Sequence, residues 1–140
     1  MAPFVHENHP NAVRVRDAIL SGMTGDLSKI DALLSPDAIQ RAPGLNPLSG
    51  HYPARSAFTA LAGMVAYTNG TFRAQNEIVL GNDHYAVAMN RITAQHGSRS
   101  LDHVLCGVWV FEGDHVIEIS DHFSTARQFD AFWVPDQDEN

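Results

Sequence analysis

Asp121 and His122 stand in a strand-like stretch near the end of the chain, GDHVIEISDHFSTAR. Residues along a strand alternate between two faces, so Ile117, Ile119 and Asp121 share one side. If that side faces the interior, the chain buries an ionisable carboxylate, which is costly unless the group is paired, hydrogen-bonded or neutral. Such a carboxylate is a candidate general acid or base. The alternative is that the strand ends there and Asp121 lies in solvent, capping a helix that begins near Ser124.

Two further side chains on the preceding strands share the odd numbering of Asp121. Neighbouring strands lie about 4.8 Å apart, so a regular register predicts that Arg91, His103 and Asp121 form a catalytic triad. Arg91 would hold Asp121 ionised, and His103 could carry a proton or bind a substrate carbonyl. The structural alternatives are a buried salt bridge between Arg91 and Asp121 and a His103 that is hydrogen-bonded to backbone.

The composition excludes several classes of protein. With 140 residues, 44% of them hydrophobic, the chain suits one globular domain. A formal charge of −7 without a basic run disfavours a nucleic-acid partner. Cys106 is the single cysteine, so no internal disulfide forms, and no Cys/His spacing resembles a zinc site. Without a leader-like N-terminus or a membrane-span-length apolar segment, we expect no membrane partner and a cytoplasmic location.

The spacing of apolar residues predicts helices first and strands afterwards. Helices are expected over 11–23, from 26 to Pro36 and from about 54 to 69, with a short strand over 38–42, four long strands over 72–80, 85–95, 101–111 and 116–123, and a terminal helix or turn over 124–132. The turn signals GND, HGSR and EGDH are typical of consecutive antiparallel strands. The layout predicts an α+β domain over 11–133, between a tail over 1–10 and an acidic tail over 134–140.

Four motifs carry a resemblance to a known superfamily. They are GDL from Gly25, APGLNPLSG after the short strand, NGTF before the long strands, and GDHVIEISDHF followed by FDAFW. Together they resemble the nuclear-transport-factor-2-like (NTF2-like) superfamily, in particular its SnoaL-like branch. The resemblance implies a cone: a strongly curved, mixed but mainly antiparallel sheet wrapped around N-terminal helices, enclosing a mostly apolar pocket and often dimerising through the sheet. It also matches Asp121 to the pocket acid or base of SnoaL-type polyketide cyclases and to the last-strand aspartate of limonene epoxide hydrolases.

The sequence departs from the epoxide hydrolases at most of their other positions. Arg91 is retained, but Thr93 stands where that family has a second aspartate. Its water-positioning tyrosine and asparagine fall at Gln40 and Ala42. Epoxide hydrolysis by the ordinary mechanism is therefore not assigned.

Ketosteroid isomerases and polyketide cyclases fit no better. The isomerase base and its tyrosine donor fall at Ala42 and Ala18. The cyclase histidine falls at Gly107, although His103 lies on the same predicted face and could substitute. The resemblance thus fixes a fold and leaves the activity open, as superfamilies of this kind host many functions.

We expect a small enzyme that acts without a cofactor or metal on a hydrophobic metabolite through one pocket acid or base. Cyclisation, isomerisation, dehydration and ring-opening hydrolysis all fit, and the alternative is a non-catalytic ligand-binding or dimerisation module. The residues expected to bind the substrate are Trp109, Leu105, Met89, Phe58, Tyr67, Thr93 and Ile119. The alternative for each is a purely structural place in the hydrophobic core.

The even-numbered face of the sheet predicts a homodimer. It carries more apolar groups than a solvated sheet face normally does: Ala86, Ala88, Ile92, Val104, Val108 and Val110. Twofold pairing of two sheets is the commonest way to cover such a face.

Overall fold

Four long strands joined by tight turns make up most of one curved sheet, as the alternating sequence predicts. A computed structural model describes residues 7–134. Its elements are α1 (Pro10–Met23), α2 (Ser28–Leu33), β1 (Leu34–Ala42), β2 (Gly50–Pro53), α3 (Ser56–Tyr67), β3 (Arg73–Gly81), β4 (Tyr85–His96), β5 (Arg99–Glu112), β6 (His115–Phe123) and α4 (Ala126–Trp133). The described strands form a six-stranded sheet in the order β2-β1-β6-β5-β4-β3, in which β1 and β6 run parallel and the other neighbours antiparallel.

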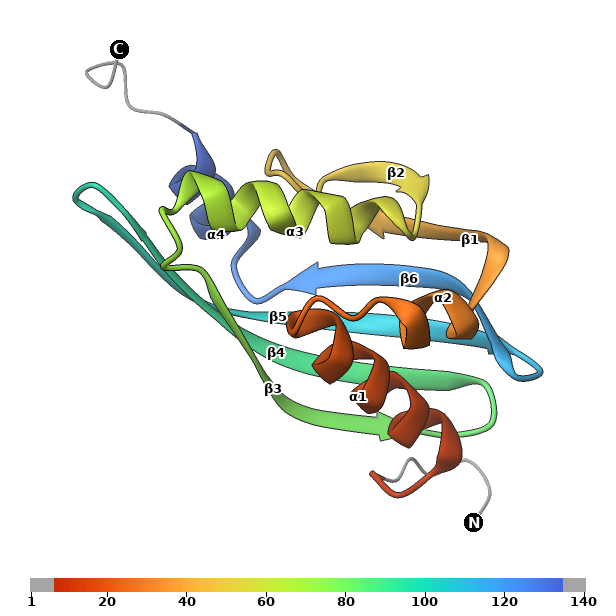
Figure 1. Cartoon of the computed structure of the whole chain (residues 1–140). Helices are drawn as coiled ribbons and strands as arrows, with labels where there is room; N and C mark the ends of the chain where they lie inside the picture. Colours follow the sequence, from red (N-terminus) through yellow and green to blue (C-terminus); the bar gives the residue numbers. More distant parts are fainter. Residues whose placement is uncertain (1–6, 135–140) are drawn as a thin grey trace.

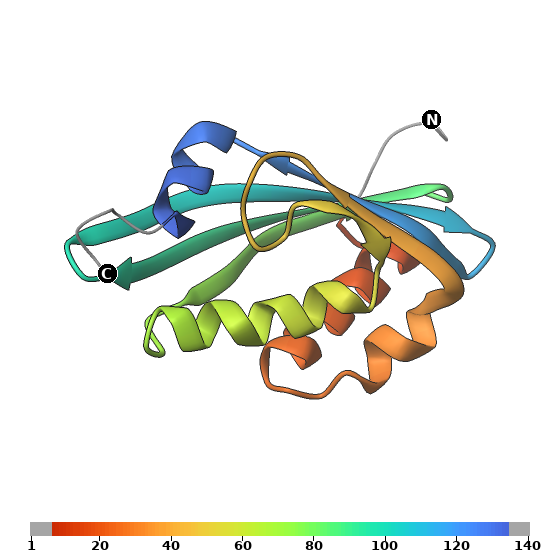
Figure 2. The ribbon, with the colours of Figure 1, turned by 90° about the horizontal axis from the view of Figure 1, so that it is seen from above.

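Helices α1, α2 and α3 lie along the same face of this sheet (Figures 1 and 2). The side chain of His9 accepts a hydrogen bond from the backbone N–H of Asn11 and caps α1, with Pro10 in its first turn. Gly81 of β3 allows α1 to approach the sheet, because a Cβ there would lie 2.9 Å from the backbone nitrogen of Ala12. The short helix α4 packs at the ends of β5 and β6.

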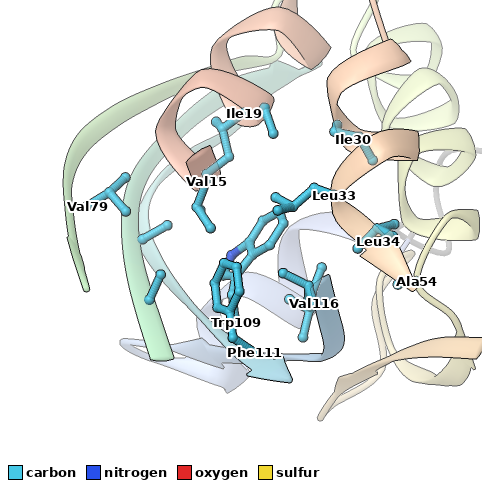
Figure 3. Close-up of a cluster of buried hydrophobic side chains, with 14 of the residues drawn as sticks. Val15, Ile19, Ile30, Leu33, Leu34, Ala54, Val79, Trp109, Phe111 and Val116 are labelled. Carbon is cyan, nitrogen blue, oxygen red and sulfur yellow. The ribbon is translucent and has the colours of Figure 1, made fainter. Parts of the chain in front are cut away.

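Two apolar clusters hold the helices on the sheet. The first joins α1 and α2 to the sheet through Val15, Ile19, Ile30, Leu33, Trp109, Phe111 and Val116, whose side chains meet in Figure 3. The second joins α3 and α4 to the other end of the strands through Met64, Phe72, Ile92, Leu101, Leu105 and Phe129. The space between the two clusters is where a cavity can form.

Strands β4 and β5 present residues of opposite parity to the same face. A two-residue turn joins them, so His96 pairs with Arg99 and Ala88 pairs with Gly107. The prediction that odd positions of the last strands face inward is therefore wrong for β4. Met89, Arg91 and Thr93 lie on the outer face, while Ala86, Ala88 and Ile92, which were expected outside, are buried beneath the helices.

Strands β5 and β6 do share parity, because a bulge corrects their register. The hairpin begins with Glu112 opposite His115, which again pairs even with odd. Ile117 has no partner, and beyond it Gly107 pairs with Asp121. The bulge thus brings Asp121 to the helix-covered face with Ile119, whereas Ile117 itself does not share their regular alternation.

Strand β2 was not predicted, and β1 is longer than the short strand expected there. Pro53 ends β2 at the edge of the sheet, where a missing N–H is tolerated, and only pairing with β1 makes this Gly- and Pro-rich segment extended. The predicted tails over 1–10 and 134–140 fall mostly outside the described residues. None of the helices within residues 7–134 has the length and apolar character needed to cross a bilayer.

Candidate active site

A cavity of about 570 Å³ lies between the two apolar clusters. Its walls come from the end of α1, from one side of α3 and from the sheet, and they include Ile19, Phe58, Leu61, Leu105, Trp109 and Ile119. The size and the mostly apolar lining are typical of small-molecule sites. Within the described part of the chain, Asp121 is the only carboxylate among the lining residues.

The prediction that Asp121 is buried in a pocket is confirmed. The residue is 6% exposed and faces the cavity from β6. Burial disfavours the charged form and raises the pKa of Asp121 from 3.8 to about 6, against the opposing effects of the hydrogen bond from Gln40 and the charge of His122. The carboxyl group can therefore gain or lose a proton close to neutral pH, as a general acid or base must.

Gln40 holds Asp121 from the neighbouring strand β1. Its Nε2 donates a hydrogen bond of 2.6 Å to Asp121 Oδ2. Next to it on β2, Tyr52 donates from its hydroxyl to the carbonyl oxygen of Leu48 at 2.6 Å. Burial and the nearby charge of Asp121 raise the pKa of Tyr52 to about 12, so its proton stays in place. Tyr52 thus stays protonated and fastens the loop before β2 through its hydrogen bond to Leu48.

Gly107 leaves room beside Asp121 on the other flank. A Cβ at this position would lie 3.1 Å from Trp109 Nε1 and 3.7 Å from Asp121 Oδ1. The missing side chain leaves a space in the cavity that Trp109 Nε1 and Asp121 Oδ1 both border.

Arg91 does not reach Asp121, contrary to the predicted triad. On the outer face its Nη2 and Nε donate to Asp102 Oδ2 and Oδ1 at 2.6 and 2.9 Å. This hydrogen-bonded pair raises the pKa of Arg91 and lowers that of Asp102. The two-residue turn between β4 and β5 causes the error, because it places odd β4 residues beside even β5 residues.

His103 is on the inner face but outside the cavity lining. It is 3% exposed, and its ring lies 5.2 Å from that of Phe129 and 6.0 Å from that of Phe123. The backbone N–H of Thr125 donates to His103 Nε2 at 3.4 Å, which requires a neutral acceptor nitrogen, and burial lowers the pKa of the imidazole. His103 therefore anchors the start of α4, as the backbone-bonded alternative had it.

Four of the seven expected substrate-binding residues line the cavity: Trp109, Leu105, Phe58 and Ile119. Met89 and Thr93 lie on the outer face for the same reason as Arg91. Tyr67 stacks on His96 at 4.0 Å between ring centres and packs near Trp133, away from the cavity.

The sequence-based prediction assigned no role at the site to Gln40 or to Asn90. Asn90 lines the cavity and accepts a hydrogen bond of 2.9 Å from Asn76 on the adjacent strand. A signal for Gln40 existed, because it alternates in phase with Ala38 and Ala42 as a polar residue on an apolar strand face. Among residues 7–134, no three His, Cys, Asp or Glu side chains are grouped to hold a metal ion.

A curved sheet wrapped around helices encloses an apolar cavity, and within residues 7–134 Asp121 is the one buried carboxylate; this architecture defines a class of α+β folds with a central pocket. The chain has the NTF2-like fold: it matches an NTF2-like protein from Burkholderia pseudomallei with a TM-score of 0.64 and 18% identity over 89% of this chain and 98% of that one. The predicted resemblance is confirmed at the level of the fold. No protein-family model matches the sequence, and no curated protein does.

Two other solved structures extend the comparison. Bal32a, from a soil-derived mobile gene cassette, is 27% identical with a TM-score of 0.78 over 92% of this chain and 100% of its own. IdmH from Streptomyces antibioticus, provisionally assigned as a polyketide cyclase, is 12% identical with a TM-score of 0.65 over 83% of this chain and 93% of its own. Structural neighbours of this chain thus include proteins linked to small-molecule chemistry.

Proposed function

We propose that the protein is a small-molecule enzyme that transfers a proton to or from a hydrophobic metabolite, with Asp121 as its general acid or base. The observation that carries this proposal is a buried carboxylate with a pKa of about 6 facing a mostly apolar cavity. Proton transfer alone serves cyclisation, isomerisation, dehydration and ring opening, and needs no group beyond the carboxylate and a positioned substrate. IdmH, which shares the fold, is provisionally assigned to one of these reactions.

The mechanism follows from the surroundings of Asp121. Above its pKa the carboxylate accepts a proton from a carbon or oxygen of the substrate, and Gln40 Nε2 steadies the negative charge on Oδ2 beforehand. After the transfer the protonated carboxyl returns the proton to another atom of the same molecule. The apolar walls keep bulk water away and hold the substrate against the carboxylate.

A reaction that reports any accessible base tests the proposal. Nitrobenzisoxazole opens its ring when a base removes its carbon-bound proton, and the product absorbs visible light. We expect wild-type protein to accelerate this reaction with a rate that rises through about pH 6 and then levels, following ionisation of Asp121. Asp121→Asn should lower the rate by about 100-fold or more.

Asp102→Asn is the matched control, because Asp102 is an exposed acid on the outer face of the same sheet. It should leave rate and pH profile unchanged. Equal rates for wild type and Asp121→Asn would contradict the proposal.

A non-catalytic ligand-binding module is the second candidate. It is favoured by one observation: neither Arg91 nor His103 joins Asp121 in the cavity. Tight binding of apolar compounds without proton transfer from any of them would select this candidate.

We also propose that two copies pair through the outer face of the sheet. The apolar residues there are Ile78, Leu80, Tyr85, Val87, Met89, Val104, Val108 and Val110, of which Ile78, Tyr85 and Met89 are 37%, 48% and 38% exposed. The Arg91–Asp102 and Arg41–Glu118 ion pairs lie on the same face and neutralise its charges. A second copy would cover this apolar surface by twofold pairing.

A further inference from the structure

The side-chain oxygen of Gln40 is a buried acceptor without a donor. Gln40 is 6% exposed and lines the cavity, and its Nε2 is used by Asp121. Its Oε1 is buried and has no hydrogen-bond partner among residues 7–134. An unpaired buried acceptor costs about 1–3 kcal/mol, so a native protein normally supplies a partner. In a cavity-lining residue, a bound molecule is the partner to expect.

The indole N–H of Trp109 is a donor without an acceptor on the opposite flank of Asp121. Strands β1 and β5 are the two neighbours of β6, so Gln40 and Trp109 approach the carboxylate from opposite sides. Gln40 contacts Oδ2, and Trp109 Nε1 lies near the open position above Gly107, which Oδ1 also faces. Trp109 lines the cavity, and within residues 7–134 its indole N–H donates no hydrogen bond.

An acceptor and a donor that flank one carboxylate call for a ligand group that both donates and accepts, and a hydroxyl does so through a single atom. A hydroxyl donates one hydrogen bond and accepts two. A carbonyl oxygen, an ether oxygen and an ionised carboxylate cannot donate to Gln40, and an ammonium cannot accept from Trp109. The rest of the lining is mostly apolar.

We propose that the cavity binds an apolar, ring-sized molecule by one buried hydroxyl group, which donates to Gln40 Oε1 and accepts from Trp109 Nε1. This inference rests on the proposed function in taking the Asp121 cavity as the site, and it names the substrate class. Gln40 and Trp109 are then specificity-determining residues. The hydroxyl lies against Asp121, so the proton that Asp121 moves belongs to the hydroxyl oxygen or to a carbon close to it.

Two probes of equal shape test the proposal, 1-naphthol and 1-methylnaphthalene, with dissociation constants measured by calorimetry. We expect wild-type protein to bind 1-naphthol about 10-fold tighter or more, because only the hydroxyl satisfies the buried oxygen of Gln40. Gln40→Met keeps the length of the side chain and removes the amide. Trp109→Phe keeps an aromatic ring and removes the N–H. Each variant should reduce the preference, Gln40→Met to near unity.

Leu61→Met is the matched control, since Leu61 lines the same cavity with no polar group. It should change the affinity for both probes alike. Equal binding of the two probes by wild type, or binding of neither, would overturn the proposal. A preference that survives in both Gln40→Met and Trp109→Phe would also overturn it, and would assign the Gln40 oxygen to a bound water.

Tighter binding of 1-naphthylmethylamine than of 1-naphthol would show that the cavity prefers an ammonium group to a hydroxyl group, and would also overturn the proposal. Failure of the proposed function is a separate result. If the protein prefers the hydroxyl probe but Asp121 transfers no proton, the proposed enzymatic function is contradicted and the proposed ligand class is supported.

Discussion

At the scale of single residues, two buried titratable groups differ in role because their partners differ. Asp121 faces a cavity and keeps one oxygen next to open space, while His103 is enclosed by aromatic rings and accepts from backbone. Burial alone, which the strand pattern predicts for both, does not separate them. The partners come from α4 and β1, whose positions the local sequence does not state.

Asp121 should make the protein less stable as the pH rises. Its pKa is 3.8 in the unfolded chain and about 6 in the folded one, so the native state binds more protons between these values. The free energy of unfolding therefore falls across this window, by at most about 3 kcal/mol. Asp121→Asn does not titrate. Its stability relative to wild type should rise between pH 4 and pH 7, measured by chemical denaturation at each pH.

Arg91→Met is the control for this titration. The arginine bonds Asp102 on the far side of the sheet, so its removal should leave the pH dependence caused by Asp121 in place. A variant difference between Asp121→Asn and wild type that stays constant with pH would mean that Asp121 is solvated.

At the scale of elements, the sequence predicts which segments are helices and strands better than which face each strand buries. Alternation within β4 is clear, with Ala86 and Ala88 on one side and Tyr85 and Met89 on the other. Both sides are apolar, so the pattern cannot choose between them. The choice depends on the register across each turn and on the bulge at Ile117, which arise only when strands pair. The cavity carboxylate and several apolar lining residues were predictable, and the hydrogen-bond partner Gln40 was not.

The packing of α1 on β3 makes a prediction at this scale. Gly81→Ala places a methyl group 2.9 Å from the backbone nitrogen of Ala12. This backbone atom belongs to α1, so the whole helix would have to move to relieve the clash. We expect a loss of about 1–3 kcal/mol in the free energy of unfolding. Gly63→Ala is the control, because nothing lies within 4 Å of its new methyl group inside α3. It should stabilise by up to about 1 kcal/mol. Equal effects in denaturation experiments would contradict the close packing of α1.

At the scale of the whole molecule, the sheet divides two tasks between its faces. The helix-covered face carries the cavity, and the outer face carries the apolar surface that we propose to be the dimer interface. The outer face is apolar as predicted, but its β4 residues are Tyr85, Val87 and Met89 and not Ala86, Ala88 and Ile92. Both faces of β4 are apolar, so the exchange leaves the character of the outer face unchanged. The predicted pairing therefore does not depend on the error in parity.

The dimer can be tested by light scattering. We expect wild-type protein at tens of micromolar to have twice the mass of the chain. Met89→Asp places a charge on β4, in the apolar part of the outer face between β3 and β5, and should give a monomer. Leu20→Asp is the control, since Leu20 is 48% exposed on α1 and should leave the dimer intact. A monomeric wild type would contradict the pairing.

Because of the bulge at Ile117, the number of residues between the β5–β6 turn and Asp121 determines which face of the sheet the aspartate occupies. Strand β6 carries one residue more than its partner between the β5–β6 turn and Asp121. A homologous chain without the bulge would bring the acid to the same cavity only if it stood one residue closer to the turn. A chain that lost the bulge but kept its aspartate at the same distance from the turn would place that aspartate on the outer face and present the residues that match Ser120 and His122 to the cavity. When homologues are aligned, a one-residue gap in this hairpin should therefore be taken as evidence about which side chain faces the ligand.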